Sequence, residues 1–330
     1  MRILITGGTG LIGRRLCRAL LAEGHELTVF SRNPASVPVK CGAAVHAIGS
    51  LAEWHPDMAF DAVINLAGEP IIDKRWSAQR KQLLWDSRVT LTEELVRRIA
   101  AAEHKPSVLL SGSAVGYYGN GGDLNLDETA DAGAGFAAEL CKAWEDAARG
   151  AEKLGVRPQH GAAEPSGAGV AASHLLPQTA GFAGNVSKVR VCLLRTAPVL
   201  SNDGGLLARM LPPFRLGLGA RLGDGKQWMS WVHIEDYAAM VLRLLRDEQM
   251  HGPYNMAAPN PVTNAEFTAT LAATLHRPAF LVAPAALLKL AMGESASLLL
   301  EGQRVLPRKM EAAHQRFAFP TLADALRDLV

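Results

Sequence analysis

The glycine-rich turn near the N-terminus limits the possible folds more than any other feature of the chain. The run RILIT at residues 2–6 is short, apolar and β-branched, as buried parallel strands are, and TGGTGLIG follows it directly. Apolar residues then recur at helical spacing as far as Gly24, a typical helix stop. A glycine pattern alone is weak evidence, but between a strand and a helix it predicts a dinucleotide-binding βαβ unit. We expect Gly7 to allow the tight turn, Gly10 to admit a pyrophosphate and Gly13 to let the helix pack closely.

Strands and helices alternate along most of the chain. This alternation predicts an α/β protein built on a Rossmann-type, doubly wound parallel sheet. We expect a nucleotide-binding domain over 1–200 and a smaller C-terminal α+β domain over 201–330 on the substrate side. Within the second domain, residues 201–232 are rich in Gly, Pro and Arg and are expected to be mostly loop. After the first helix, the expected strands cover 25–32, 61–68, 107–113 and 189–200, and the expected helices cover 78–103, 135–154 and 233–248.

One segment breaks this alternation. Residues 158–188 are rich in Ala, Gly, Ser and Pro and carry scarcely any charge, and the dipeptide VR stands on both sides, at 156–157 and 189–190. Removing residues 158–190 would join EKLGVR to VCLLRT through a link of ordinary length. We therefore interpret 158–190 as an insertion with a duplicated edge and expect an exposed, mobile excursion. A specificity loop or a partner-binding flap is the functional alternative.

Composition excludes several classes of partner. The 330 residues carry a formal net charge of only +2, which gives no reason to expect nucleic acid or an anionic membrane as a partner. The four cysteines lie far apart without metal-ligand spacing, so we expect reduced thiols and no metal. No apolar run reaches the ~18 residues that a membrane span requires. The chain enters its first strand at once, and we expect a cytoplasmic protein with a small-molecule substrate.

The end of the second expected strand indicates the coenzyme. An NAD site usually has an acidic residue there, whereas an NADP site tends to have an arginine. Here the strand reads LTVFSRNP, with Ser31 and Arg32 at its end. Arginine can contact a 2′-phosphate with two parallel hydrogen bonds, although an exposed arginine can also be a solvated cation. We predict NADP, and the turn NLAG at 65–68 either passes under the ribose or is simply a tight strand end. The predicted cofactor-binding residues are Gly7, Gly10, Leu11, Ile12, Gly13, Ser31, Arg32, Leu66, Ala67 and Gly68.

At this point the chain resembles a known superfamily. TGGTGLIG, NLAG, SGSAVGYYG at 111–119 and WVHIEDYA at 231–238 are typical of the extended and atypical short-chain dehydrogenases/reductases. More narrowly, INLAGEPI, KRW, LCxxWE, CLLRT, MLPPFRLGLG and MGESA are similar to an uncharacterised NAD(P)-dependent epimerase-like family. That family has a C-terminal domain of unknown function, here matching about 277–325. The resemblance covers nearly the whole chain except 158–190 and supplies no reaction.

The resemblance implies catalytic positions that this chain fills unusually. In the superfamily a Ser orients the substrate carbonyl, a Tyr donates the proton, a Lys four residues later lowers the Tyr pKa, and a helical Asn completes a proton relay. None of the four tyrosines is followed four residues later by Lys. Alignment on Glu145 puts Ala137 at the Tyr position and Cys141 at the Lys position, and a one-residue shift would use Ala138 and Lys142 instead. The narrower family shows the same Cys, and it has an Arg in place of the helical Asn.

Five residues are the candidates for replacing that chemistry. Ser113 matches the superfamily Ser, with Ser111 as the weaker alternative, and Tyr117 and Tyr118 follow on the same loop. Both tyrosines could instead be wall residues of a cleft. Cys141 would be a thiol acid or nucleophile if a nearby arginine lowered its pKa, and otherwise a small buried hydrophobe. The predicted catalytic residues are Ser113, Tyr117, Tyr118, Cys141 and Arg88, the last matching the Asn position and either binding the substrate or tuning the thiol.

Two further segments supply polar and aromatic groups on the expected substrate side. The segment after NLAG is EPIIDKRW, and its charged residues would suit an anionic or sugar-like substrate or would simply be solvated. The second segment is LPPFRLGLGARLGDGKQWMSWVH at residues 211–233. In extended reductases the corresponding region holds the nucleotide of a nucleotide-sugar. We expect His233 and Asp236 to cap their helix rather than to act in catalysis. The residues concerned are Glu69, Lys74, Arg75 and Trp76 in the first segment and Arg215, Trp228, Trp231 and His233 in the second.

The sequence therefore predicts an NADP(H)-binding atypical short-chain reductase or epimerase-like enzyme. Its substrate would be small and polar, with a nucleotide-sugar as one candidate, and its active site would lack the Tyr–Lys pair. The competing hypothesis is a catalytically silent NADP(H)-binding module that signals redox state through a partner, because fold does not imply function.

Overall fold

The computed structural model describes residues 1–156 and 187–330. The predicted insertion therefore lies outside the described residues, apart from 187–190. On either side of it, β7 (Gly155–Val156) and β8 (Ser187–Lys188) pair antiparallel.

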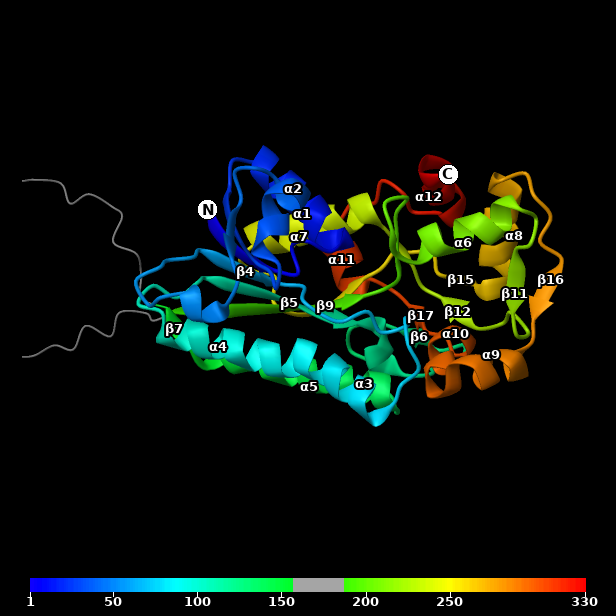
Figure 1. The fold of residues 1–330 in the computed structure, drawn as a ribbon, viewed down its shortest axis with the longest axis horizontal. Coiled ribbons are helices and arrows are strands. Elements are labelled where there is room, and N and C mark those ends of the chain that lie inside the picture. The colour runs from blue at the N-terminus through cyan, green and yellow to red at the C-terminus, as the bar shows by residue number, and fades with distance from the viewer. Residues whose placement is uncertain (157–186) are drawn as a thin grey trace, which may run out of the picture.

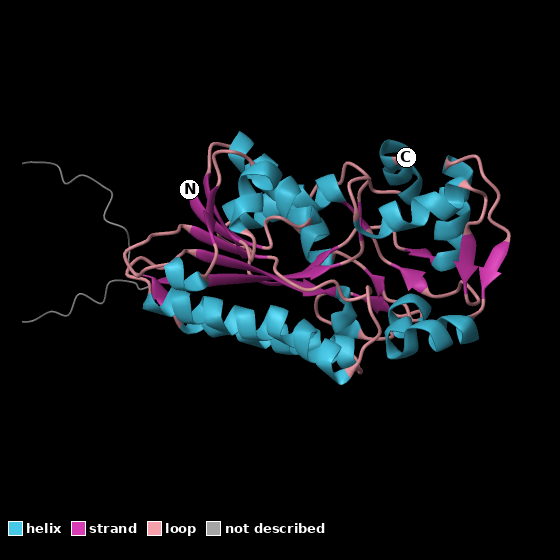
Figure 2. Cartoon of the chain, in the orientation of Figure 1, coloured by secondary structure: helices cyan, strands magenta, loops and turns pink. Residues whose placement is uncertain are grey.

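A seven-stranded sheet forms the centre of the protein, and all its pairings are parallel (Figure 1, Figure 2). Its strand order is β14-β9-β5-β4-β1-β2-β3. Successive strands are added on one side of β1 as far as β3 and on the other side from β4 onward, so the predicted doubly wound fold is confirmed. The carboxyl ends of the strands face the second half of the chain. The strands are β1 (Arg2–Thr6), β2 (Glu26–Phe30), β3 (His46–Ile48), β4 (Ala62–Asn65), β5 (Val108–Ala114), β9 (Arg190–Thr196) and β14 (Gly252–Met256).

Helices cover both faces of this sheet (Figure 1). Because side chains alternate along a strand, Ile3 and Ile5 join the core under α1 and α7, whereas Leu4 joins the core under α4 and α5. Burial on both faces explains why the strands are almost wholly apolar. One face carries α1 (Leu11–Ala22), α2 (Val37–Cys41) and α7 (Ile234–Arg246), and the other carries α3 (Ala78–Trp85), α4 (Leu91–Ala101) and α5 (Phe136–Arg149).

The long helix predicted over 78–103 is interrupted. Between α3 and α4, residues Asp86–Thr90 form a π-helical turn, η3, with Arg88 at its middle. Such turns insert an extra residue into a helix and redirect side chains, frequently at functional sites. No feature of the sequence pattern signalled it.

The second half of the chain contains more helix than predicted. Residues 201–232 are not mostly loop, because α6 (Gly205–Arg215) buries Leu207, Leu211 and Phe214 while carrying two prolines in its last turn. The strand predicted over 189–200 also ends early, at Thr196, and Val199–Leu200 (β10) pairs in a separate sheet with β13 (Val232–His233).

The remaining elements of this half are short. The other strand pairs are β11 (Ala220–Leu222) with β16 (Leu281–Ala283), β12 (Trp228–Met229) with β15 (Val262–Thr263), and β6 (Asn125–Leu126) with β17 (Arg304–Val305). The other helices are α8 (Asn264–Thr274), α9 (Ala285–Met292), α10 (Ser297–Leu300), α11 (Arg308–Ala312) and α12 (Leu322–Leu329). The domain boundary predicted at residue 200 stays a prediction, and α7 and β14 beyond it belong to the layers of the central sheet.

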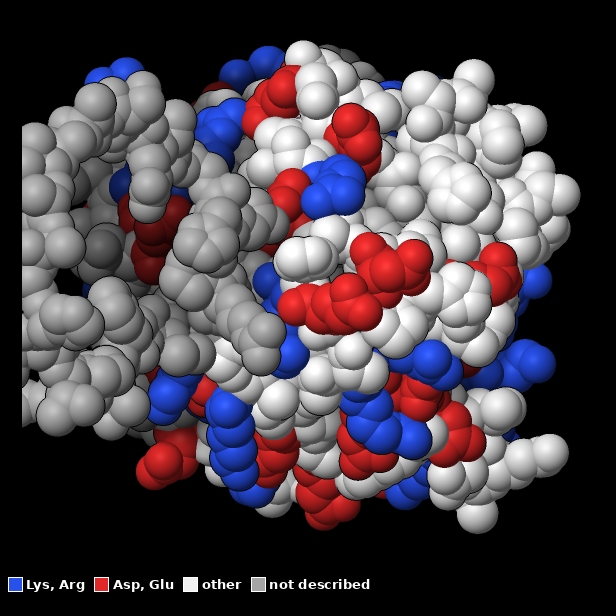
Figure 3. All heavy atoms as spheres, turned by 90° about the vertical axis from the view of Figure 1, so that its left-hand side faces the viewer, with Lys and Arg blue, Asp and Glu red and all other residues white. Residues whose placement is uncertain are grey.

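Two surface observations bear on partners. None of the helices in the described residues is both long and apolar enough to cross a membrane. On the end of the molecule opposite the second half, basic and acidic side chains are intermixed over the visible face rather than gathered by sign (Figure 3).

Candidate functional site

Two glycine-containing turns meet at the carboxyl edge of the sheet. Gly7 has a positive φ of 71°, and a Cβ on it would lie 2.6 Å from the carbonyl carbon of Leu66, in the turn after β4. A Cβ on Gly13 would lie 2.3 Å from the oxygen of Gly7, closer than real atoms approach. Gly10 stands at the N-cap of α1 and makes no side-chain cap, which leaves the helix N-terminus open to an anion. The absence of side chains here creates a cradle in which a dinucleotide phosphate fits.

A buried hydrogen-bond network holds the turn after β4. Thr6 Oγ1 donates to Asn65 Oδ1 at 2.6 Å, and Asn65 Nδ2 donates to Thr92 Oγ1 at 2.8 Å and to Ser111 Oγ at 3.2 Å. The backbone N–H of Ala67 in turn donates to Thr6 Oγ1 at 3.2 Å. Ser111 is therefore a scaffold residue in this structure. The pattern of apolar strands did not indicate this network, because its members come from four separate elements.

The end of β2 reaches the same turn through an ion pair. Arg32, whose side chain is 85% exposed, places Nη1 2.7 Å from Glu69 Oε1. Glu69 Oε2 also lies 3.5 Å from Arg80 Nη1. The guanidinium of Arg32, and to a smaller extent that of Arg80, holds the pKa of the Glu69 carboxyl below its usual value. The Glu69 side chain, expected on the substrate side, is thus engaged between two arginines. Ser31 Oγ donates to the backbone oxygen of Asn33.

A buried ion pair lies beneath the end of β5. Arg195 on β9 donates from Nε to Glu145 Oε1 at 2.8 Å and from Nη2 to Oε2 at 3.0 Å, and both side chains are almost wholly buried. Ser113 Oγ donates to the same Glu145 Oε1 at 2.8 Å and is only 4% exposed. The Ser113 hydroxyl, which was predicted to orient a substrate carbonyl, is thus hydrogen-bonded to the Glu145 carboxylate.

The two predicted tyrosines differ in their surroundings. The Tyr118 hydroxyl lies 2.7 Å from Asn255 Oδ1 and accepts a hydrogen bond from Arg195 Nη1 at 3.0 Å. Burial raises the Tyr118 pKa to about 12. Tyr117 is half-buried, and its ring centroid lies 3.6 Å from the Arg195 guanidinium carbon. Tyr117 is therefore the more available phenol of the two.

Cys141 is buried against the loop after β5. Its sulfur would lie 3.8 Å from a Cβ on Gly116, and burial together with Glu145 raises its pKa to about 11. The charges of Arg88 and Arg195 oppose this shift but do not reverse it. Arg88 therefore does not bring the Cys141 pKa below its usual value, because desolvation of the thiolate outweighs the attraction, and a catalytic role for Cys141 stays a prediction.

Several residues expected on the substrate side are structural. Trp76 is 9% exposed and donates from Nε1 to the oxygen of Ile71. Trp231 is 1% exposed and donates to the oxygen of Asn260, and Trp228 donates to Asp123 Oδ1 at 2.8 Å.

The expected capping at the start of α7 is confirmed for His233 but not for Asp236, which binds the backbone of a distant segment. His233 Nδ1 accepts a hydrogen bond from the N–H of Glu235, and the Asp236 carboxylate accepts from the N–H groups of Ala318 and Phe319. Burial also lowers the His233 pKa, as expected for a neutral capping imidazole.

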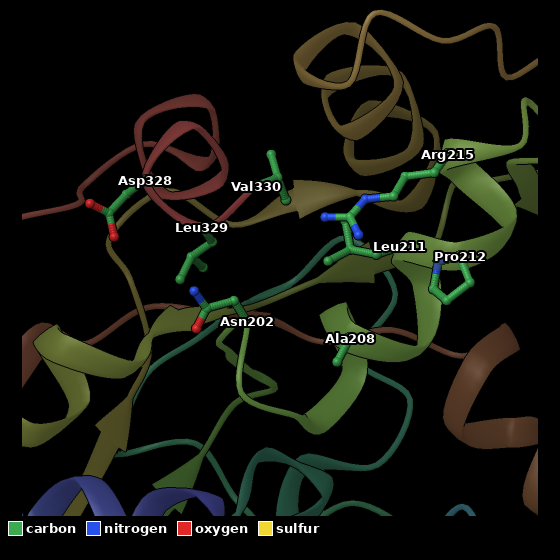
Figure 4. A pocket seen from close by; sticks show the side chains of 8 residues that line it. All are labelled: Asn202, Ala208, Leu211, Pro212, Arg215, Asp328, Leu329 and Val330. Atoms are coloured by element: carbon green, nitrogen blue, oxygen red, sulfur yellow. The ribbon is translucent and has the colours of Figure 1, made fainter.

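A separate surface pocket of about 430 Å³ lies between α6 and the C-terminal helix α12 (Figure 4). Arg215 extends into it toward Val330, so its side chain belongs to this pocket and not to the turns after β1 and β4. None of the predicted coenzyme residues lines it. The lining residues are Asn202, Ala208, Leu211, Pro212, Arg215, Asp328, Leu329 and Val330.

Comparison with known proteins identifies the family. Residues 3–257 match the NAD dependent epimerase/dehydratase family, and residues 283–329 match a domain of unknown function. An epimerase family protein of Mycobacterium bovis is 38% identical over 98% of this chain and 96% of its own length. The human epimerase family protein SDR39U1 is 34% identical over the full length of both chains. The chain belongs to the NAD-dependent epimerase/dehydratase family, and the resemblance read from its motifs is confirmed.

Solved structures agree with this assignment. The crystal structure of human epimerase family protein SDR39U1 (isoform 2) with NADPH superposes with a TM-score of 0.82, at 34% identity, over 100% of this chain and 99% of that one. A UDP-galactose 4-epimerase, at 16% identity, superposes with a TM-score of 0.69 over 99% of this chain and 96% of its own and shares the fold.

Proposed function

We propose that the chain binds NADP(H) across the turns after β1 and β4, with Arg32 contacting the 2′-phosphate. The observation that carries this proposal is the cradle formed by Gly7, Gly10 and Gly13, which side chains would fill, next to an exposed arginine in place of an acidic residue. The relative crystallised with NADPH supports the same coenzyme. In this proposal Arg32 exchanges its Glu69 partner for the phosphate.

We further propose that the bound coenzyme serves a reductase or epimerase reaction on a small polar substrate. A reduced nicotinamide supplies hydride when bound, and the protein must then position a carbonyl and provide a proton. Tyr117 is the phenol that can give this proton, since Tyr118 is held by Asn255 and Arg195. The Ser113 hydroxyl can donate a hydrogen bond to a substrate carbonyl only if its present hydrogen bond to Glu145 is broken.

Three observations favour the competing function, a silent NADP(H)-binding module. The hydroxyls of Ser113 and Tyr118 are engaged within the protein, and the Cys141 thiol is buried with a raised pKa. Such a protein would bind the coenzyme without turnover and report its redox state to a partner.

Coenzyme choice is tested by replacing Arg32. Arg32→Gln should weaken NADPH binding about 10- to 100-fold, because it removes charge-assisted hydrogen bonds to the 2′-phosphate, and should leave NADH binding nearly unchanged. Dissociation constants for both coenzymes can be measured by nicotinamide fluorescence. Arg327→Gln is the matched control, since Arg327 is similarly exposed and ion-paired, with Asp324. Equal losses for NADPH and NADH would contradict the assignment of Arg32 to the 2′-phosphate.

Turnover is tested by isotope transfer. The protein is loaded with NADPH deuterated at C4, in each stereochemical form, and mixed with a metabolite extract, and mass spectrometry detects labelled products. A reductase should transfer the label, and Ser113→Ala and Tyr117→Phe should reduce the transfer. Ser107→Ala, at the opposite end of β5, is the control and should not. Tight NADPH binding without labelled product would exclude net reduction of the metabolites present and favour the silent module, leaving only an internally closed epimerisation to the enzyme.

A further inference from the structure

The π-helical turn presents Arg88 to the turn after β4. A Cβ on Gly68 would lie 3.0 Å from both the Arg88 guanidinium carbon and Nη2, so the planar group lies directly against the glycine backbone. On its other side the guanidinium lies 5.4 Å from the Trp144 ring centroid. Arg88 is half-buried and fixed between these two surfaces.

The hydrogen bonds of Arg88 go to neutral acceptors. Nη2 donates to the backbone oxygen of Glu69 at 2.8 Å, and Nη1 donates to the oxygen of Leu84 and to Ser87 Oγ, both at 3.3 Å. Within the described ranges 1–156 and 187–330, no carboxylate oxygen lies within 4 Å of it. Burial lowers the Arg88 pKa, which is the expected response of a cation that has lost water without gaining a paired anion.

The charges around this turn do not balance. Arg32, Arg80 and Arg88 all contact residue Glu69, which contributes one carboxylate. Arg80 is itself 8% exposed, and its Nε is buried without a hydrogen-bond partner. A partly desolvated cation is costly unless an opposite charge pairs with it, and a planar guanidinium matches the two oxygens of a carboxylate or phosphate.

We propose that Arg88 binds an anionic group, a carboxylate or a phosphate, on the substrate of this protein. The inference rests on the proposed function and adds the class of substrate. The strand order β2-β1-β4-β5 supports a substrate rather than a coenzyme contact. Arg32 follows β2, the glycine cradle follows β1, and Arg88 lies against Gly68 after β4 with Trp144 of α5 on its other side. Arg88 thus contacts the backbone of Glu69 from the β4 side, whereas Arg32 reaches the Glu69 carboxylate from the β2 side.

The probes for this site are acetate, inorganic phosphate and the neutral isostere acetamide. Each is titrated into the NADPH-loaded protein at constant ionic strength. Nicotinamide fluorescence is the readout for all three, and saturation-transfer NMR adds the methyl signals of acetate and acetamide. We expect at least one anion to bind, and acetamide to bind at least about 10-fold more weakly. Arg88→Gln should weaken anion binding about 10-fold or more, while Arg88→Lys should retain part of it, since a point charge remains without the planar fork.

Controls separate this proposal from its alternatives. Arg98→Gln removes an arginine of α4 that is paired with Glu94, and should leave anion binding unchanged. Thermal midpoints establish that the Arg88 variants are folded, and Arg88→Lys provides the comparison if Arg88→Gln is not. Unchanged anion binding in both Arg88 variants, or a parallel loss of NADPH affinity, would overturn the proposal. If wild type binds NADPH but neither anion, only this inference fails. If it does not bind NADPH, the proposed function fails with it.

Discussion

Replacing Glu145 by alanine is expected to cost about 3–5 kcal/mol of the free energy of unfolding, because it leaves the Arg195 guanidinium buried without its anion. The pair is bidentate and only 2–3% exposed, and Glu145 also accepts the Ser113 hydroxyl. Urea denaturation followed by far-UV circular dichroism measures the loss. The matched control is Asp146→Asn on the same helix, which breaks only the exposed pair with Lys142 and should leave the denaturation midpoint unchanged.

The double variant makes this test sharper. Glu145→Gln combined with Arg195→Met removes both charges and keeps much of the volume, and apolar replacement of a whole buried pair is often tolerated. We expect the double variant to be more stable than Arg195→Met alone, which leaves the buried carboxylate with only Arg149, 3.6 Å away, and the Ser113 hydroxyl. A double variant whose loss equals the sum of the two single losses would show that the two side chains are not coupled.

Five strands of the central sheet, β1, β2, β4, β5 and β9, were predictable because each carries a local signal, whereas β3 and β14 were not predicted. Residues 2–6 and 107–113 are apolar runs that end in glycines or small residues, and the first glycine turn lies between a strand and a helix. The family motifs extended this prediction to nearly the whole chain except 158–190. By contrast, α6 was missed since its prolines at 212 and 213 read as breakers, whereas the buried residues of its apolar side stabilise the helix.

The candidate site was only partly predictable, because side-chain direction depends on partners far away in sequence. Ser113 is correctly placed at the end of β5, yet its hydroxyl turns to Glu145, and Glu145 is fixed by Arg195, fifty residues further along. The Cys141 position was likewise found by alignment, but the sign of its pKa shift depends on how deeply α5 is buried. The π-helical turn that presents Arg88 has no periodicity that separates it from the α-helix on either side.

Gly13→Ala is the second change with a large expected effect. Its Cβ would lie 2.3 Å from the Gly7 oxygen and 2.6 Å from the Gly8 Cα, so α1 must move away from the turn after β1. Forcing an extra methyl against packed backbone costs about 1–3 kcal/mol of stability. Because the displaced helix N-terminus is also the proposed phosphate site, NADPH binding should weaken roughly 100-fold or more, which corresponds to about 2.7 kcal/mol.

Gly10→Ala separates the two consequences. A Cβ on Gly10 would meet only the Gly7 oxygen, at 3.3 Å, so the variant should unfold at nearly the wild-type urea concentration. If a pyrophosphate passes over Gly10, NADPH binding should still fall, because the methyl occupies the space of the phosphate. Gly13→Ala would then lose both stability and binding, and Gly10→Ala binding alone. Normal NADPH affinity in both variants would place the coenzyme elsewhere and remove the basis for assigning Arg32 to its 2′-phosphate.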